Sequence, residues 1–285
     1  MGTAPAIHPT QRPRRTAPLT PRSGAVRAAE RLVPADLPTL SLLDLPHEAA
    51  LLTRIDRKYV LTRNEVPPLM SGLDPSTRIL AVAGALAQSY GTTYFDTPDL
   101  RCFRDCAHPR RRRFKVRTRT YVDAGLSFLE VKTRGPRGRT AKERTPLPPG
   151  APTDMIDEGG RTWVDGVLRG IGLPPGVAAT LGPSLHGVYV RTTLLLPGGQ
   201  GRATIDTSLA WALPDGRSLG RPDLVVIETK SASTPSSLDR LLWSAGHRPQ
   251  RISKYATALA ALEADLPDNR WARTLAAHFH PSPLA

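Results

Sequence analysis

The sequence predicts an α+β protein built on a closed antiparallel β-barrel with flanking helices and a charged interior. The first observation is the run 113–121, in which every second residue from Arg113 to Arg119 is a cation, so that four positive side chains share one face of an extended strand. The same alternation, now with carboxylates beside the cations, recurs in residues 129–134, 202–206 and 226–230. Several strands with charged faces indicate a closed sheet whose lumen holds a polyanion and a metal ion.

The first 34 residues are expected to lie outside this barrel as a disordered, basic tail. They are rich in Pro, Arg, Ala and Thr and show no apolar periodicity. They carry six arginines and one glutamate, yet the chain as a whole has a net charge of +14, so the remainder is also basic. Residues 35–285 are therefore expected to form one domain whose partner is an anion.

The first half of the domain is expected to enter through a broken helix and continue mainly as strands. Leucines and alanines at helical spacing around Pro46 predict the broken helix over 40–54. A helix over 64–73 should be capped near Thr62. Strands are expected at 57–61, 89–95, 111–121 and 126–134, the last two forming a hairpin through residues 123–125.

The second half is expected to return to the sheet and end in helices. Residues 134–144 are interpreted as a Gly/Arg-rich connector and 146–152 as a loop. Further strands are expected at 186–196, 202–211 and 223–231, and helices at 162–170, 234–246 and 253–264. Thr234 and Pro235 are suited to cap and begin the first of the two closing helices.

Several common classes of protein are excluded or disfavoured. The two cysteines, Cys102 and Cys106, are too few for a disulfide framework and are interpreted as ordinary thiols of a cytoplasmic protein. No apolar run approaches the ~18 residues that span a bilayer, and no signal peptide is recognisable. Walker, dinucleotide-binding, zinc-protease and nucleophile-elbow motifs are absent from the sequence. The expected chemistry is therefore positioning and charge neutralisation.

The candidate anion site is a set of cations contributed by strands and connectors far apart in the sequence. Arginine suits it because its planar fork donates two parallel hydrogen bonds to phosphate oxygens. Among the carboxylates of the same strand faces, Glu228 is the best metal candidate, since it directly follows the apolar run 224–227. Glu130 and Asp206 could equally form ion pairs. Ser253 and Lys254 lie where the last helix is expected to begin, which would also favour an anion.

Six motifs, taken in order, resemble the VTC domain, the polyphosphate polymerase domain of the triphosphate tunnel metalloenzyme superfamily. They are Asp56-Arg-Lys-Tyr59, Tyr94-Phe-Asp-Thr-Pro-Asp-Leu100, Arg113-Phe-Lys-Val-Arg-Thr-Arg-Thr-Tyr121, Phe128-Leu-Glu-Val-Lys132, Ile227-Glu-Thr-Lys230 and Ile252-Ser-Lys-Tyr255. The resemblance covers about residues 50–260 and leaves out the tail of 1–34. One motif departs from the family pattern, because Asp56-Arg-Lys58 stands where Glu-x-Lys is usual.

The resemblance implies a tunnel barrel of about eight strands that transfers the γ-phosphate of ATP, or of another nucleoside triphosphate, to inorganic polyphosphate with Mn²⁺ or Mg²⁺. The catalytic cations it implies are Lys58, Arg117, Arg119, Lys132, Lys142, Arg191, Arg202 and Lys254. The substrate-binding candidates are Arg113, Lys115, Lys230, Ser253 and Tyr255. The metal candidates are Glu228, Glu130 and Asp206.

Three other functions remain open on the sequence. A triphosphate hydrolase would use the same lumen with water as acceptor, and a non-catalytic polyphosphate-binding module would use the same cations. A nucleic-acid binder is disfavoured, because the cations alternate with carboxylates and aromatic residues make up only 5% of the chain. A separate membrane partner that accepts the polymer would be compatible with this organisation.

Overall fold

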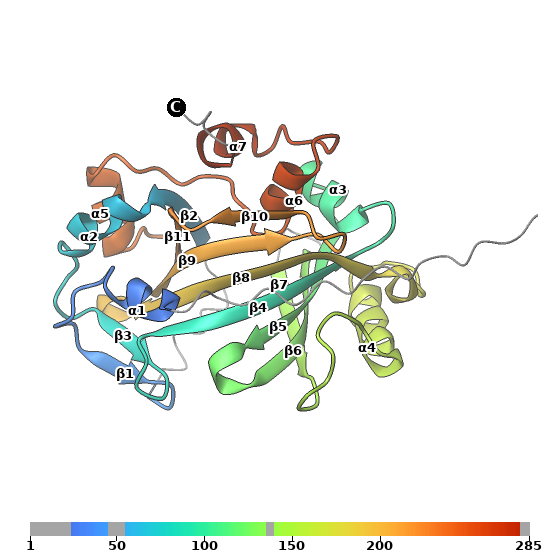
Figure 1. Ribbon diagram of the computed structural model, residues 1–285, viewed down its shortest axis with the longest axis horizontal. Helices are drawn as coiled ribbons and strands as arrows, with labels where there is room; N and C mark the ends of the chain where they lie inside the picture. Colours follow the sequence, from blue (N-terminus) through green and yellow to red (C-terminus); the bar gives the residue numbers. More distant parts are fainter. Residues whose placement is uncertain (1–23, 45–54, 135–139, 280–285) are drawn as a thin grey trace, which may run out of the picture.

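One large sheet organises the molecule (Figure 1). The computed structural model describes residues 24–44, 55–134 and 140–279. The sheet has eleven strands, of which eight follow a single hydrogen-bonded path in the order β2-β11-β9-β8-β4-β5-β6-β7. All pairings along this path are antiparallel. Outside the path, β10 pairs with β9, and β3 pairs with β8 and, in parallel, with β1.

The strands are β1 (Thr39–Ser41), β2 (Ile55–Thr62), β3 (Arg78–Ala81), β4 (Ala87–Asp96), β5 (Arg113–Tyr121), β6 (Leu126–Arg134), β7 (Thr140–Pro146), β8 (Gly182–Leu195), β9 (Arg202–Ala212), β10 (Ser218–Arg221) and β11 (Leu224–Ser231). The helices are α1 (Ala25–Glu30), α2 (Val66–Met70), α3 (Arg101–Ala107), α4 (Glu158–Arg169), α5 (Ser237–Ser244), α6 (Ala256–Leu262) and α7 (Ala272–His278).

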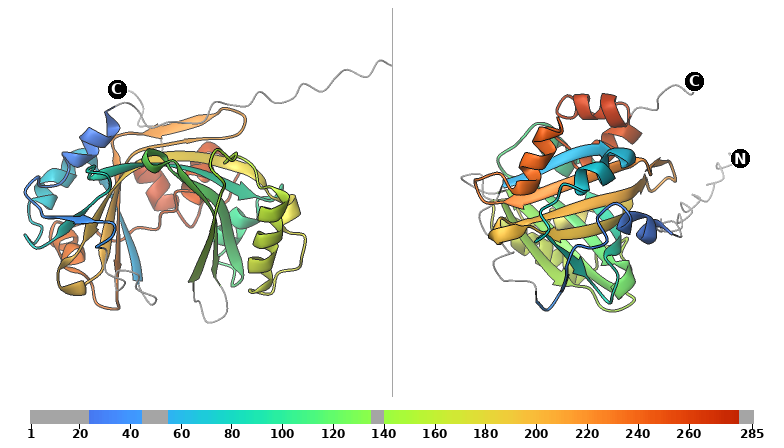
Figure 2. Two further views of the ribbon diagram at one scale, coloured as in Figure 1. Left: turned by 90° about the horizontal axis from the view of Figure 1, so that it is seen from below. Right: turned by 90° about the vertical axis from the view of Figure 1, so that its left-hand side faces the viewer.

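The predicted closed barrel is wrong, because the sheet is an open arch. Within the described residues, the strand path ends at β2 and β7, which do not pair with each other. Figure 2 (left) shows the two legs of the arch separated on their lower side. Alternation of charged and apolar residues fixes which side chains share a face, but it does not fix the strand tilt and stagger that closure requires. The result is a mixed α/β fold with a charged face on the concave side of the arch, and we call this concave face the groove.

Most predicted strands are confirmed, and their ends have local causes. The β5–β6 hairpin turns at Gly125, whose φ of 62° is favourable for glycine. The helix predicted after the first long strand is a 3₁₀ turn followed by α2, and Thr62 and Glu65 form its capping box. The first closing helix, α5, begins later than predicted, because Ser236 caps it instead of Thr234.

Two of the segments predicted to lie outside the strands contain strands themselves. The interpreted connector of 134–144 contains most of β7, which pairs with β6 along its whole length. The broken helix predicted over 40–54 is not observed at its start, where residues 39–41 form β1, and residues 45–54 lie outside the described part. Both misses are short strands that form only by pairing with a neighbour, β7 with β6 and β1 with the more distant β3.

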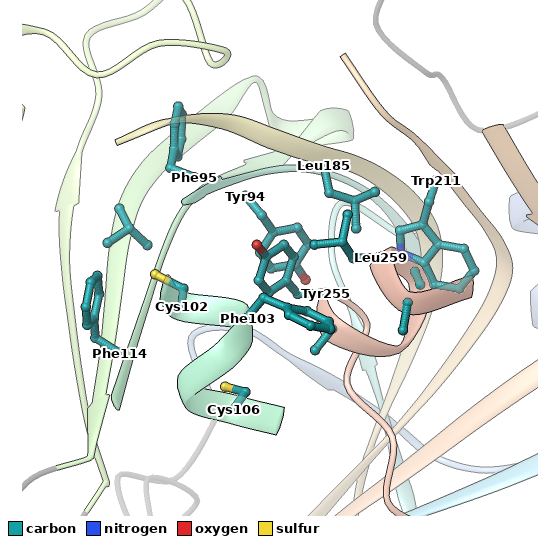
Figure 3. Close-up of a cluster of buried hydrophobic side chains, with 14 of the residues drawn as sticks. Tyr94, Phe95, Cys102, Phe103, Cys106, Phe114, Leu185, Trp211, Tyr255 and Leu259 are labelled. Atoms are coloured by element: carbon teal, nitrogen blue, oxygen red, sulfur yellow. The ribbon is translucent and has the colours of Figure 1, made fainter. Parts of the chain in front are cut away.

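The outer and inner faces of the arch are packed differently. On the outer face, Tyr59, Leu61 and Ile227 join a buried cluster with α2 and α5. On the inner face, helices α3 and α6 fill one end of the arch (Figures 1 and 3). There the rings of Tyr94 and Tyr255 stack with centroids 5.0 Å apart. The other end of the inner face carries charged side chains together with the rings of Tyr90 and Tyr189.

The predicted tail of residues 1–34 overlaps ordered structure. Ala25 and Ala29 of α1 pack against Ala87 and Val190 of the sheet. Leu32 and Val33 are buried in the outer cluster, and each such side chain contributes about 1.5–3 kcal/mol to folding. The ordered part therefore begins no later than residue 24, and residues 1–23 lie outside the described residues.

Candidate active site

The register of the sheet brings the predicted cations to one surface, the concave face of the arch. Directly opposed residues of neighbouring strands share a face. Lys58 of β2 opposes Glu228 of β11, and Arg117 of β5 opposes Glu130 of β6. Further opposed pairs on this face are Lys230 with Arg202, Arg191 with Asp206, Lys115 with Lys132, Arg113 with Arg134, and Lys132 with Lys142. Strands that lie far apart in the sequence thus build one cationic groove.

Glu130 is the centre of a buried charge cluster on the β5–β6–β7 leg. Its carboxylate is 2.6 Å from a guanidinium nitrogen of Arg117 and 2.5 Å from Nζ of Lys142. Nε of Arg119 lies 3.9 Å away. Burial alone would raise the pKa of Glu130, but these three cations outweigh it and lower the pKa to about 2. Glu130 is therefore a neutralising anion that holds three candidate catalytic cations together.

Asp206 has the same role on the β8–β9 part of the face. It is fully buried, and Arg191 donates to both its carboxylate oxygens at 2.6 and 2.8 Å. Lys254, which precedes α6, donates to the same carboxylate. Burial would raise the pKa of Asp206, but the charges of Arg191 and Lys254 lower it to about 2. The bidentate geometry fixes the Arg191 guanidinium.

Glu228 lies with lysines on the β11–β2 leg. Its carboxylate is 2.5 Å from Nζ of Lys230. Burial opposes ionisation of Glu228, but Lys58 and Lys230 lower its pKa well below the ordinary value. Burial in turn lowers the pKa of Lys230, although Glu228 opposes that shift. Glu228 is thus an ionised carboxylate with basic neighbours on the open groove.

Backbone geometry fixes the position of Arg202 beside this leg. Gly201, which precedes it, has a φ of 121°, and a Cβ there would lie 2.0 Å from the carbonyl oxygen of Lys230. Only glycine permits this close approach of two backbones. Arg202 is consequently held at the start of β9, opposite Lys230.

The residues just before α6 reach the site only in part. Ser253 Oγ accepts a hydrogen bond of 2.9 Å from Nζ of Lys115, and Lys58 Nζ donates to the carbonyl oxygen of Ile252 at 3.3 Å. Tyr255, predicted to bind substrate, is 2% exposed and donates its hydroxyl to Asp96. The structure therefore joins Ser253 to the cationic face and places Tyr255 in the packed end of the arch. The predicted helix over 253–264 begins later, at Ala256.

The three metal candidates do not form one cluster. In the described part of the chain, no group of three or more His, Cys, Asp or Glu side chains is placed to hold a metal ion. Glu130 and Asp206 are each neutralised by cations, which favours the ion-pair interpretation for both. Glu228 remains suited to a hard cation, because Mg²⁺ is commonly bound by one or two carboxylates together with phosphate oxygens of the substrate.

Comparison with known families identifies the fold of this groove. Residues 53–263 match the VTC domain family along most of the chain. The chain belongs to the VTC domain family. The match contains all the strands of the eight-strand path and the residues before α6 that reach the cations. No curated protein matches the sequence.

Solved structures similar to this VTC domain are distant in sequence. A candidate adenylate cyclase from Bacillus halodurans is 15% identical with a TM-score of 0.46, over 70% of this chain and 94% of its own. A candidate adenylyl cyclase from Hippeastrum, described as having a dominant triphosphatase activity, is 16% identical with a TM-score of 0.47, over 75% and 98% of the two chains. Within the described residues of this VTC domain, no helix is both long and apolar enough to cross a membrane.

Sequence reasoning missed the polar and aromatic residues that lie between the cations. The hydroxyl of Tyr189, Oγ1 of Thr92, Oγ1 of Thr204 and Nε of Arg119 are buried, and no described atom hydrogen-bonds to them. Burial would raise the pKa of Tyr189, but Arg119 and Arg191 lower it overall. Buried polar atoms without partners on a cationic face are suited to a polyanion. Tyr189 could have been found from its position two residues before Arg191, on the same strand face.

Two lysines of the VTC domain give the groove a predicted pH dependence. Although 38% of its side chain is exposed, Lys142 loses hydration to the surrounding protein, which lowers its pKa to about 8. Although part of its side chain is open to solvent, Lys132 also has a pKa of about 8, because surrounding protein removes hydration and Lys58 repels its charge. Both amines lose their charge as the pH rises through 8. Calorimetric titration without metal should therefore show inorganic triphosphate binding weaken between pH 7 and pH 9, by less than the full effect of a buried charge because both side chains are partly exposed.

Arginine at the same positions provides the control for this prediction. An arginine keeps its charge across this pH range, so K132R and K142R should each flatten the pH profile, and the double variant should flatten it most. An unchanged profile in the double variant would show that neither lysine titrates on binding.

Proposed function

We propose that this protein is a polyphosphate polymerase that transfers the γ-phosphate of ATP onto a growing inorganic polyphosphate chain. The observation that carries the proposal is the concave face, where cations from seven strands outnumber carboxylates that are themselves paired with cations. Condensed phosphates carry many adjacent charges, so a groove of converging arginines and lysines is suited to them. Membership of the VTC domain family supports the same function.

In the proposed reaction, an oxygen of the chain-terminal phosphate attacks the γ-phosphorus of ATP. The bond between that phosphorus and the β,γ-bridging oxygen breaks, and ADP leaves with the electron pair. Arg117, Arg119 and Lys142 would stabilise charge on the transferred group, while Glu130 holds these three cations in place. No side chain needs to form a covalent bond to substrate.

Glu228 would hold the divalent cation, Mn²⁺ or Mg²⁺, with phosphate oxygens of the substrate completing its coordination. When bound, the cation would neutralise charge on the phosphates. Lys58 and Lys230, which flank Glu228, would bind the same phosphates directly. The remaining predicted cations, Arg191, Arg202 and Lys254, would extend the groove along the chain of phosphates.

The proposal is tested by incubating the purified protein with ATP and Mn²⁺ and separating the products on a gel. A ladder of polyphosphate supports the polymerase. Free phosphate without a ladder would assign a triphosphate hydrolase that uses water as acceptor. Binding of polyphosphate with ATP left intact would assign the accessory module.

Replacing Glu228 by glutamine tests the metal assignment. The variant keeps volume and hydrogen-bonding capacity but loses the charge, so the apparent metal affinity should fall by roughly tenfold while the melting temperature changes little. Activity measured against Mn²⁺ concentration gives the affinity, and a thermal melt without metal gives stability. Unchanged metal dependence would remove Glu228 from the metal site, and loss of folding would assign it to a structural ion pair with Lys230.

A further inference from the structure

Four of the chain's aromatic residues gather on the concave face, at the end that α3 and α6 leave open. The rings of Tyr90 and Tyr189 are stacked, with centroids 5.2 Å apart and planes within 2°. Tyr121 lies 5.0 Å from Tyr90, and Phe128 lies 5.8 Å from Tyr121. Aromatic residues make up only 5% of the chain, so a row of four beside the cations is a concentrated feature of the groove.

The row runs from a buried inner half to an accessible outer half. Tyr90 and Tyr189 are 8% and 3% exposed, whereas Tyr121 and Phe128 are only half-buried. Leu126, which opposes Tyr121 on the same face, is 55% exposed. We call Tyr121, Leu126 and Phe128 the aromatic lip. It is an apolar surface at the edge of a polar groove, formed by the β5–β6 hairpin.

The aromatic lip is continuous with the candidate phosphate site. Phe128 directly opposes Arg119. Tyr121 is two residues beyond Arg119 on β5, which places it about 7 Å farther along the strand. The guanidinium of Arg144 lies 4.8 Å from the centre of the Phe128 ring. A ligand with triphosphate at one end and a flat apolar group at the other would therefore meet cations and aromatic rings in the same order.

From this arrangement we propose that the aromatic lip binds the base of a nucleoside triphosphate by stacking, with Phe128 and Tyr121 as the contact residues. The proposal rests on the proposed function, because it assumes that the phosphates lie along Arg119 and Arg117. Stacking uses the π-face that every base has, and larger rings bury more area. Purine nucleotides should accordingly bind more tightly than pyrimidine nucleotides, with little choice between adenine and guanine.

The test compares two ligands that carry the same triphosphate, ATP and ribose 5′-triphosphate, which lacks the base, both titrated without metal. Calorimetric titration of the parent should show tighter binding of the nucleotide. In F128L and Y121L, nucleotide affinity should fall by about 5- to 100-fold, while affinity for ribose 5′-triphosphate should stay within about twofold. F128W should keep the nucleotide affinity of the parent or raise it, because a larger ring still stacks.

M155A is the matched control, since Met155 is 52% exposed but lies outside the groove, in the segment before α4. It should bind both ligands like the parent. The proposal is overturned if the parent does not distinguish the two ligands, if F128L and Y121L weaken both equally, or if F128W loses nucleotide binding while folding normally. If the parent makes polymer and both leucine variants bind nucleotide normally, only the proposed base-binding role of the aromatic lip is wrong. If the parent binds nucleotide through the aromatic lip but makes no polymer, only the proposed polymerase activity is wrong.

Discussion

Replacing Arg117 or Arg119 by alanine should weaken binding of inorganic triphosphate by about 1.5–3 kcal/mol, the scale of a charge-assisted hydrogen bond lost from a sequestered site. Both guanidinium groups lie on the concave face beside Glu130. Nε of Arg119 is buried, lies 3.9 Å from the Glu130 carboxylate and has no hydrogen-bond partner among the described residues. Removing Arg117 also leaves the negative charge of Glu130 less neutralised, and that charge would repel a bound phosphate. Calorimetric titration of each variant without metal measures the loss.

Two further substitutions separate geometry from charge in this prediction. Lysine at position 117 or 119 keeps the positive charge but loses the planar fork, so it should repair the defect only partly. Thr118→Arg tests the opposite face of the strand. Thr118 is 1% exposed and donates a 2.5 Å hydrogen bond to the carbonyl oxygen of Thr153, so a cation there should lower the melting temperature before it alters binding. If both alanine variants bind like the parent, the cations are a solvated surface and the groove is not a phosphate site.

The composition of the concave face could be predicted from the sequence because side-chain direction in a strand has a period of two. Alternation alone placed Arg117 and Arg119 on one face of β5 and Glu130 and Lys132 on one face of β6. It also indicated that charges of both signs would occur together. The pairing of Glu130 with Arg117, and of Asp206 with Arg191, follows from the register that such faces adopt.

Features decided by tertiary contacts could not be predicted in the same way. β7 has no buried residue and no apolar alternation, so only its pairing with β6 makes it a strand. Helix α3 is stabilised by Asp96, whose carboxylate accepts hydrogen bonds from the backbone nitrogens of Cys102 and Phe103. Tyr255 follows two residues that reach the groove, yet its hydroxyl turns to Asp96. Closure of the sheet likewise depends on edge strands and their tilt, which no local pattern encodes.

Replacing Asp206 by asparagine should destabilise the fold by about 3 kcal/mol, because it removes a buried carboxylate that pairs with two half-buried cations, Arg191 and Lys254. The pKa of Asp206 is about 2, below its ordinary value, so this carboxylate stabilises the parent above pH 4 and the contribution is lost as the pH falls toward 2. The asparagine variant should lack that part of the acid transition. Chemical unfolding at pH 7 and at pH 3 measures both effects.

Inorganic triphosphate should reverse the defect, and this distinguishes an ion pair from a metal ligand. In D206N the guanidinium of Arg191 and the amine of Lys254 are left with excess positive charge, so added triphosphate should raise the melting temperature of the variant more than that of the parent. A metal ligand predicts a different outcome, in which the variant loses stabilisation by Mn²⁺ and gains nothing from triphosphate. D215N is the matched control, because Asp215 pairs with Arg217 at 2.8 Å on the exposed surface, where such a pair contributes about 0–1 kcal/mol. A D206N variant as stable as D215N would contradict the prediction, because it would show that Arg191 and Lys254 need no buried counter-charge.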